Sequence, residues 1–377
     1  MVGEGGVELE NENGGLRGVG GTVCSGFMET EFTGTLLDGA QLGGVCRAVG
    51  NTPLLKLGSL SAATGCEILA KAEFMNPGGS IKDRPALGMI LAAERDGRLQ
   101  SGGLIVEGTA GNTGIGLTLL GRSRGYRMLA VLPEGISEEK VALLRAVGAE
   151  VRVAPDVCVD DARHYVREAE RLATTLPGGW WVNQFDNTAN RRMHFETTGP
   201  EIWAQSGGRV DAFVAAVGSG GTLAGTGAFL KSRNPSLRVV CADPAGASMY
   251  SWIKYKRAEC SAGDSVAEGI GQNRVTRNIA DAPLDDACRV PDLLAVAMQH
   301  LLLREEGLFV GLSAAVNVCG AVWLGLKGGR GQVISTVLCD GGGRYVSRLF
   351  NKEWLSSRGL EPLITRDELF VRIAAME

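Results

Sequence analysis

Short apolar runs typical of β-strands alternate with helical patterns along most of the chain. The runs occupy residues 104–107, 126–132, 150–153, 180–183, 210–217, 237–242 and 333–339. Many are apolar at consecutive positions, as expected of strands that are buried on both faces. Strands of this kind joined by helices form parallel sheets that helices cover on both sides. The sequence therefore predicts an α/β fold, with parallel sheets in two lobes on either side of a cleft.

Helical patterns fill the intervals between these runs. They are expected at residues 114–124 and 161–175, around residues 201–203, and from about residue 223 onward. Another helix is expected after Ser137, a suitable N-cap because Glu138 and Glu139 follow it in the first turn. Open parallel sheets bind ligands at the carboxyl ends of their strands, so the turns after the strands are the places to look for a site.

Composition narrows the class of protein. The 377 residues are enough for two domains with buried cores. The formal net charge of −4 gives no positive field for nucleic acid, so nucleic-acid binding is not expected. Nine scattered cysteines without C-x-x-C spacing, and three dispersed histidines, predict no disulfide scaffold and no metal site. We expect a reducing compartment and a cytoplasmic location.

Two segments need separate interpretation. Residues 1–45 begin with eight glycines among the first 21 residues and several glutamates, which predicts a disordered tail. The acidic start argues against import into the mitochondrial matrix, but mitochondrial association stays open. Residues 307–326 carry no charge and reach the length of a membrane helix. Four glycines, Ser313 and Asn317 instead favour a buried strand followed by a core helix, so membrane insertion is not expected.

A glycine-rich turn directly precedes one lysine. Residues 76–84 read Asn-Pro-Gly-Gly-Ser-Ile-Lys-Asp-Arg, which places Lys82 just after the turn. Glycine accepts φ angles that other residues avoid, so the backbone there can approach a ligand closely. A lysine held in such a turn can form a Schiff base with pyridoxal phosphate (PLP). This segment alone leaves open an ordinary solvated lysine on a surface turn.

Two further turns are suited to anions. Residues 107–114 form a small polar loop before a helix, where backbone N–H groups and the hydroxyls of Thr109 and Thr113 would face a carboxylate or phosphate. A plain helix-capping turn is the alternative. Residues 218–222 read Gly-Ser-Gly-Gly-Thr, and three glycines let the backbone wrap around a phosphate.

A nicotinamide-dependent oxidoreductase is a rival interpretation of residues 218–222. Leu223 stands where the dinucleotide fingerprint needs its third glycine, but Asp243 ends the next strand and would suit a ribose-binding acid. This interpretation leaves Lys82 and the Thr109 loop without a role. Ser313 is a lone hydroxyl after an apolar run, and a hydrogen bond back to a helix carbonyl is its ordinary explanation.

Taken together, these segments resemble the cysteine synthase family of PLP enzymes, fold type II (tryptophan synthase β-like), which includes cystathionine β-synthase catalytic cores. The matching pieces occur in family order at residues 51–54, 76–84, 109–116, 184–190, 194–203, 218–222, 268–271 and 305–314. They cover roughly residues 48–355. The runs TAGNT, DNTANR and RYVSRLFNKEWL are most similar to the fungal-type, cysteine synthase-like branch.

The resemblance implies a role for each matching residue. Lys82 would carry the Schiff base and move the substrate's Cα proton. Asn112 would bond the cofactor's 3′-oxygen, and Ser313 would face its pyridine nitrogen. The phosphate would be held by Gly218, Ser219, Gly220, Gly221 and Thr222. The substrate would be held by Thr109, Ala110, Gly111, Thr113, Gln184 and Gly269.

The resemblance also implies the reaction. PLP withdraws electrons from Cα, so the proton there is removable and a β-substituent can leave. A serine such as Ser313 cannot hold a pyridinium, which suits β-elimination better than transamination. The implied β-replacement, that of an O-acetylserine sulfhydrylase, eliminates acetate from O-acetyl-L-serine, passes through an aminoacrylate and adds sulfide to give L-cysteine. A homodimer is implied as well.

The chain departs from the family pattern at two places. Ala110 stands where the family usually has Ser or Asn, and residues 339–345 (CDGGGRY) replace a run of the type PSSGERY. Cystathionine β-synthase-like, O-phosphoserine-dependent and deaminase activities therefore stay open as alternatives. The short sequence after Trp354 and the lack of a haem-type Cys/His arrangement near the start favour cysteine synthesis over cystathionine synthesis. A non-catalytic binding protein is an alternative of another class.

The expected domain organisation follows from the same comparison. A tail (residues 1–45) would precede a large phosphate-binding domain (residues 46–75 with 188–355), a smaller mobile domain with the lysine and the substrate loop (residues 76–187), and a C-terminal extension (residues 356–377).

Overall fold

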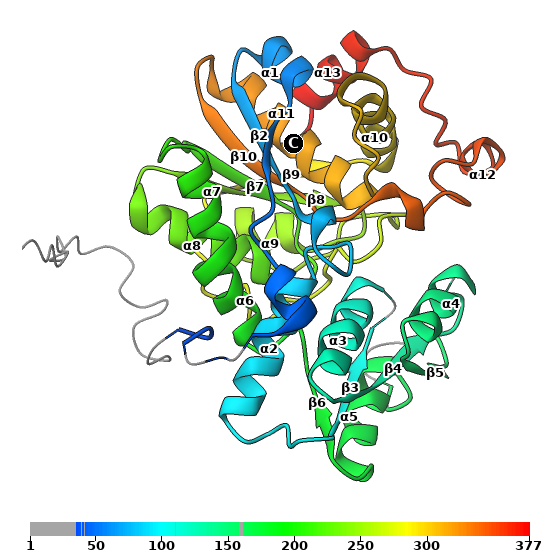
Figure 1. Ribbon diagram of the computed structural model, residues 1–377. Helices are drawn as coiled ribbons and strands as arrows, with labels where there is room; N and C mark the ends of the chain where they lie inside the picture. Colours follow the sequence, from blue (N-terminus) through cyan, green and yellow to red (C-terminus); the bar gives the residue numbers. More distant parts are fainter. Residues whose placement is uncertain (1–34, 39, 41, 110, 137, 158–160) are drawn as a thin grey trace, which may run out of the picture.

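Two sheets flanked by helices make up the fold (Figure 1). The structure is a computed structural model, and it describes residues 35–38, 40, 42–109, 111–136, 138–157 and 161–377. The prediction of an α/β fold with parallel sheets between helices is confirmed. Among the described residues, no helix has the length and apolar character needed to cross a membrane.

The larger sheet has six strands in the order β1-β2-β10-β7-β8-β9. Its strands are β1 (Leu54–Lys56), β2 (Glu67–Ala72), β7 (Ala212–Ala215), β8 (Arg238–Pro244), β9 (Asp286–Val290) and β10 (Val333–Leu338). All neighbours are parallel except the edge pair β1 and β2. Every residue of β7 and β10 is buried, which explains why β7 is wholly apolar and β10 is apolar except at Ser335 and Thr336.

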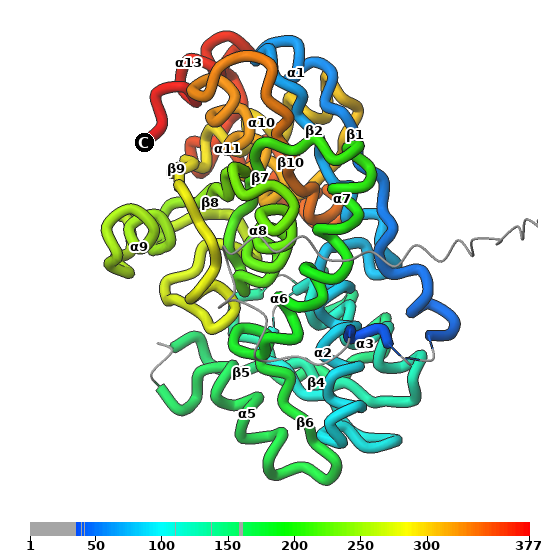
Figure 2. The backbone as a smooth tube through the Cα atoms, turned by 90° about the vertical axis from the view of Figure 1, so that its left-hand side faces the viewer, coloured from blue at the N-terminus to red at the C-terminus, as the bar shows by residue number. Residues whose placement is uncertain are grey.

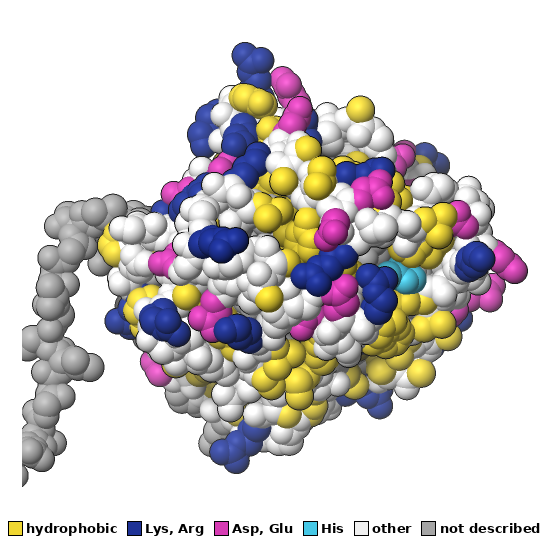
Figure 3. Space-filling view, turned by 90° about the horizontal axis from the view of Figure 1, so that it is seen from above, with side chains coloured by type: hydrophobic (Ala, Val, Ile, Leu, Met, Phe, Trp, Pro, Cys, Tyr) yellow, Lys and Arg dark blue, Asp and Glu magenta, His cyan; other side chains and the backbone are white. Residues whose placement is uncertain are grey.

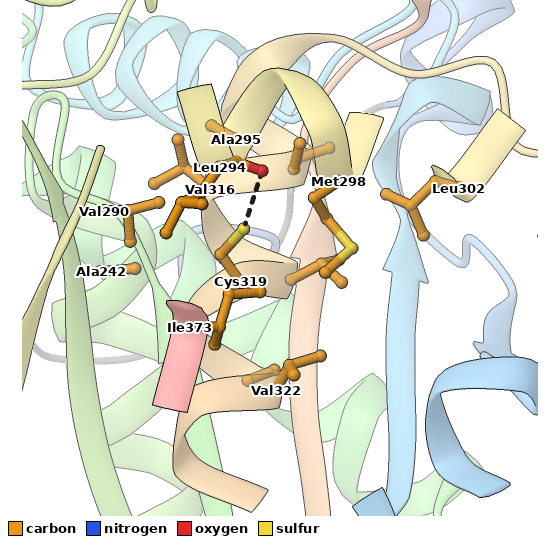
Figure 4. Packing of buried hydrophobic residues seen from close by; sticks show 14 of the residues in the cluster. Ala242, Val290, Leu294, Ala295, Met298, Leu302, Val316, Cys319, Val322 and Ile373 are labelled. Atoms are coloured by element: carbon orange, nitrogen blue, oxygen red, sulfur yellow. Dashed lines mark hydrogen bonds between the residues drawn. The ribbon is translucent and has the colours of Figure 1, made fainter. Parts of the chain in front are cut away.

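Helices cover both faces of the larger sheet. One face packs against α1 (Gly58–Thr64), α10 (Asp292–Glu306), α11 (Leu312–Gly328) and α13 (Arg366–Ala374). The other face packs against α7 (Gly199–Gln205), α8 (Gly221–Arg233) and α9 (Met249–Tyr255). Figure 4 shows the first of these cores, where the Cys319 thiol donates to the carbonyl of Leu294 at 3.6 Å. This cysteine therefore behaves as a buried apolar side chain.

The smaller sheet has four parallel strands in the order β5-β4-β3-β6. They are β3 (Leu104–Gly108), β4 (Arg127–Pro133), β5 (Glu150–Ala154) and β6 (Gly179–Trp181). One core contains side chains of α2 (Asp83–Arg95), α3 (Asn112–Ser123) and α4 (Glu138–Ala146), and α5 (Tyr165–Thr175) covers the opposite face. All four strands fall within residues 76–187, and the division into domains stays a prediction.

Short elements complete the chain. They are η1 (Gly44–Ala48), η2 (Glu73–Met75) and η4 (Gly342–Arg344), which are 3₁₀ turns, the π-turn η3 (His194–Thr198), and the helices α6 (Ala189–Met193) and α12 (Lys352–Ser356).

The structure differs from the sequence-based expectation in a few places. The strand expected at residues 210–217 is shorter, and the one expected before α11 is only a single bridge from Val310 to Gly341. Part of the expected tail is packed: the Leu36 side chain is buried, and its N–H donates to Glu196 at 2.7 Å. Ser137, the expected N-cap of α4, lies outside the described residues.

Candidate active site

A cavity of about 440 Å³ contains the predicted site residues that the structure describes, apart from Gly220, Gly221 and Thr222. Its walls come from both parts of the molecule, the larger-sheet elements above and the smaller-sheet elements below in Figure 2. The cavity lies where strands β3, β7 and β10 end, as expected for an open α/β sheet. Residues separated by more than 200 positions therefore share one space, among them Lys82 and Ser313.

Lys82 immediately precedes α2 and is half-buried at the cavity wall. The turn before it needs glycine, because Gly79 has φ +74°. The N–H of Ile81 donates to the carbonyl of Cys339 at 2.8 Å. This bond fastens the lysine turn to the end of β10.

Buried charges anchor the helix that follows Lys82. The Arg84 guanidinium is fully buried and donates to Glu73 and Glu201, each at 2.7 Å. Burial alone would raise the pKa of Glu201, but hydrogen bonds and charge from Arg84 and Lys71 bring it down to about 2. These ion pairs hold the first turn of α2, and with it the backbone of Lys82.

Residues 218–222 form a turn at the N-terminus of the 13-residue helix α8. Gly220 has φ +91°, and a Cβ on Gly221 would collide with Asn190 Oδ1. The hydroxyl of Ser219 accepts from Asn190 Nδ2 at 2.8 Å, and Thr222 Oγ1 lies 3.2 Å from His194 Nε2. A small hollow of about 20 Å³ is lined by Gly218, Ser219, Gly220, Thr222 and Lys82, among others. Backbone N–H groups at a helix N-terminus fit a phosphate group.

The loop between β3 and α3 supplies the polar wall opposite. Thr113 Oγ1 donates to Gln184 Oε1 at 2.8 Å, so the predicted substrate residues Thr113 and Gln184 are in contact. Thr109, Gly111 and Gly269 also line the cavity. Ala110, predicted to bind substrate, lies outside the described residues.

A buried carboxyl at the end of β3 holds the backbone beside Gln184, the residue that Thr113 contacts. Glu107 accepts from the backbone N–H groups of Asn183 at 2.9 Å and Gln184 at 3.2 Å. Burial raises the pKa of Glu107 to about 8, although these hydrogen bonds act in the opposite direction. At neutral pH this carboxyl is therefore mostly protonated, and it adds little negative charge where a carboxylate would bind.

Ser313, the second residue of α11, lines the cavity beside Cys339. Cys339 Sγ accepts from Asn317 Nδ2 at 3.3 Å. Burial raises the pKa of the Cys339 thiol to about 11, so it stays protonated at neutral pH.

Several wall residues were not predicted as site residues. Tyr165, Lys140, Glu268 and Tyr345 line the cavity, and Lys140 forms an ion pair with Glu268. Glu268 lies in one of the family-like runs, and its neighbour Gly269 was predicted. Lys140 and Tyr165 carry no local sequence signal.

The nicotinamide interpretation finds no support at Asp243. Its side chain is buried away from the cavity, where it accepts from the Tyr250 N–H at 2.8 Å at the start of α9. The described residues also contain no group of three side chains arranged to hold a metal ion.

Comparisons with known proteins identify the family. The model of the pyridoxal-phosphate dependent enzyme family matches residues 45–340. Cysteine synthase 1 of Emericella nidulans is 48% identical over 328 residues, which cover 86% of this chain and 88% of that protein. Cystathionine beta-synthase of Mus musculus is 35% identical over 331 residues, or 87% of this chain and 58% of that protein.

A solved structure agrees with these sequence relationships. The crystal structure of O-ureido-L-serine synthase superposes with a TM-score of 0.75 and 34% sequence identity, covering 84% of this chain and 100% of that one. The chain therefore belongs to the pyridoxal-phosphate dependent enzyme family, in which its sequence relatives include fungal cysteine synthases.

Proposed function

We propose that the protein is a PLP-dependent cysteine synthase that makes L-cysteine and acetate from O-acetyl-L-serine and sulfide. The observation that carries the proposal is the meeting of three groups around Lys82 in one cavity. These groups are the phosphate-type turn at residues 218–222, the Thr109–Thr113 loop, and the Ser313 hydroxyl. The similarity to cysteine synthase 1 over most of both chains supports this assignment.

In this proposal the chain holds the cofactor at four places. The Lys82 amine would bond it covalently, and the backbone N–H groups and hydroxyls of residues 218–222 would hold its phosphate. Asn112 would donate to the ring 3′-oxygen, and Ser313 would face the ring nitrogen as a neutral partner. Bound PLP supplies the electron sink that makes the substrate Cα proton removable.

The polar loop binds the amino-acid substrate. The backbone N–H groups at the start of α3, the hydroxyls of Thr109 and Thr113, and Gln184 hold the substrate carboxylate. The protonated Glu107 carboxyl behind the loop keeps this place free of a competing negative charge. The Lys82 amine would take the substrate Cα proton.

The charges that line the cavity favour a substrate with an uncharged acetyl ester over one with a phosphate ester. Lys82 and Lys140 are the cations among the described residues that line the cavity, and Lys140 is already paired with Glu268. A phosphate ester would add a dianion, and neither lysine lining the cavity is free to receive it, because Lys82 would bond PLP and Lys140 pairs with Glu268. An acetyl ester adds no charge and fits the same space.

A product assay tests this function and separates it from the alternatives. Purified protein supplied with PLP, O-acetyl-L-serine and sulfide should form L-cysteine and acetate in equal amounts. Turnover with O-phosphoserine alone, with serine and homocysteine, or to pyruvate and ammonia would replace the proposal with the corresponding alternative. Failure of every pair would refute a catalytic role.

We further propose that residues 76–187 form a mobile domain that closes when a carboxylate binds to the Thr109 loop. Polar contacts between this domain and the larger one include Ser347 Oγ to Glu139 Oε2 at 2.8 Å and the ion pair of Lys140 with Glu268, which closure would rearrange. Small-angle scattering with and without a bound amino acid measures the change. An unchanged radius of gyration would contradict closure.

A homodimer in the cytoplasm completes the proposal. Figure 3 shows hydrophobic side chains among the charged ones on the face it draws. The large hydrophobic side chains that are exposed include Leu303, Phe309 and Val346, at 39%, 42% and 53%. Apolar surface of this kind is typical of protein–protein contacts. Sedimentation equilibrium should give twice the chain mass, and a fluorescent fusion should locate the protein in the cytoplasm; a monomer or an organellar signal would contradict the respective part.

A further inference from the structure

The run at residues 339–345, which departs from the family pattern, touches three parts of the active site. The carbonyl of Cys339 accepts from Ile81 in the lysine turn at 2.8 Å. The carbonyl of Asp340 accepts from the N–H of Gly311, just before α11, at 3.0 Å. Side chains of the same run also contact Asn112, the first residue of α3, which belongs to the third part, the loop between β3 and α3. The run is therefore placed to fix these parts relative to one another.

Asp340 and Arg344 engage opposite ends of the Asn112 side-chain amide. Asn112 Nδ2 donates to Asp340 Oδ2 at 2.7 Å, and Arg344 donates to Asn112 Oδ1. A carboxylate oxygen only accepts and a guanidinium only donates. A reversed amide would place acceptor against acceptor and donor against donor, so the two partners permit one orientation.

In this orientation one N–H of the Asn112 side-chain amide is left for a ligand. A side-chain amide nitrogen carries two hydrogens, and Asp340 receives only one of them. Asn112 lines the cavity, so the second hydrogen is the donor that this side chain offers to a ligand there. With the amide reversed, an oxygen would face the ligand instead.

Neither partner is fully accounted for by other contacts. Asp340 is completely buried, and although Tyr345 donates to its Oδ2 at 2.6 Å, its Oδ1 has no hydrogen-bond partner among the described residues. Arg344 forms no ion pair with a described carboxylate; its other hydrogen bond goes to the carbonyl of Gly78, in the lysine turn. Burying a carboxyl group with an unpaired oxygen costs folding free energy, which suggests that Asp340 is kept for its contact with Asn112.

We propose that Asp340 and Arg344 are positioning residues that fix the Asn112 amide with its free N–H directed at the 3′-oxygen of the cofactor. The inference rests on the proposed function, because it takes PLP as the ligand. A hydrogen-bond donor at the 3′-oxygen stabilises the deprotonated form of that oxygen. The ratio of the two absorption bands of bound PLP, which differ in protonation at this oxygen, reports the bond directly.

The test compares Asp340→Asn and Arg344→Gln with the wild-type protein. Asn at position 340 has the size of Asp but both donates and accepts, so it no longer selects the amide orientation. Each variant should raise the PLP dissociation constant about tenfold, the loss expected for one hydrogen bond to a charged group. Each should also shift the band ratio toward the form protonated at the 3′-oxygen. Gly343→Ala is the matched control, because a Cβ there meets no atom within 4 Å, and it should leave both measurements unchanged.

Repeating the substitutions in Asn112→Ala protein separates an effect on the Asn112 amide from a general structural effect. In Asn112→Ala protein the amide is absent, so adding Asp340→Asn or Arg344→Gln should change the band ratio no further. Arg344→Lys keeps the charge and a donor and should recover part of the wild-type ratio. Thermal unfolding of each variant identifies any that fail to fold.

The outcomes are distinct. Coupled effects on the band ratio support the proposal, and unchanged ratios or effects that add fully to Asn112→Ala overturn it. A wild-type protein that binds no PLP would refute the proposed function itself, and this result appears before any variant is needed.

Discussion

Arg84 is the residue whose removal should cost the most stability near the active site. Its guanidinium and the Glu73 carboxylate are both fully buried, and Arg84 also pairs with Glu201. In Arg84→Met the Glu73 carboxylate keeps its hydrogen bonds from Thr52 at 2.6 Å and Asn76 at 2.8 Å but loses the cation bound to it. Glu201 keeps Lys71 at 2.7 Å. Methionine fills most of the space, so the main loss is electrostatic.

The magnitude follows from the burial of this pair. Removing one partner of a buried ion pair costs about 3–5 kcal/mol, because the other charge is left uncompensated. With an unfolding entropy of about 2.1 cal/mol/K per residue over a chain of this length, the midpoint should fall by about 4–6 °C. Differential scanning calorimetry of the wild type and Arg84→Met measures this shift.

A double variant tests the electrostatic cause. Glu73→Gln/Arg84→Met removes both charges and should recover more than half of the lost stability, because no uncompensated charge stays buried. An Arg84→Met midpoint within about 1 °C of the wild type, outside the shift expected at this chain length, would refute the reasoning. A double variant less stable than Arg84→Met would refute it as well.

Three further outcomes follow from single residues. Lys82→Ala should fold normally, as judged by circular dichroism, yet show no covalently bound PLP in its absorption spectrum; a retained Schiff-base band would contradict the role of Lys82. Thr222→Val should weaken PLP binding about tenfold by titration, since a hydroxyl bonded to a charged group is lost. Its control, Thr226→Val, removes a buried hydroxyl with no hydrogen-bond partner among the described residues and should leave binding unchanged. Equal effects of the two substitutions would count against phosphate binding by Thr222. Glu107 has a pKa of about 8 when folded and about 4.3 when unfolded, so its contribution is complete below about pH 4.3 and is lost as the pH rises through 8. Wild-type stability measured by urea unfolding should therefore fall across this range more steeply than that of Glu107→Gln, and parallel profiles would contradict the shift.

Local patterns made much of the fold and site predictable. The buried parallel strands are mostly apolar, and the turns at residues 76–84 and 218–222 carry their glycines within a few positions. Each of these signals depends only on neighbours in the sequence. The antiparallel edge strand β1 is three residues long and gives too short a pattern to be seen.

Contacts between distant segments were beyond this reasoning. Asn112 and Asp340 are 228 positions apart, and only the folded chain shows that they are hydrogen-bonded. The same holds for the ion pair of Lys140 and Glu268 at the cavity wall. The sequence drew attention to residues 339–345 as unusual, but the partners of this run depend on where the larger sheet places the end of β10.

The most direct test of the central claim is the visible absorption spectrum of the purified protein, recorded before and after addition of O-acetyl-L-serine and then sulfide. We expect a Schiff-base band from PLP on Lys82, a shift to longer wavelength with O-acetyl-L-serine, and a return to the starting band when sulfide is added. Such a cycle reports cofactor binding, elimination and replacement in one sample. Absence of any band after PLP is supplied, or a band that O-acetyl-L-serine leaves unmoved, would contradict the proposed cysteine synthesis.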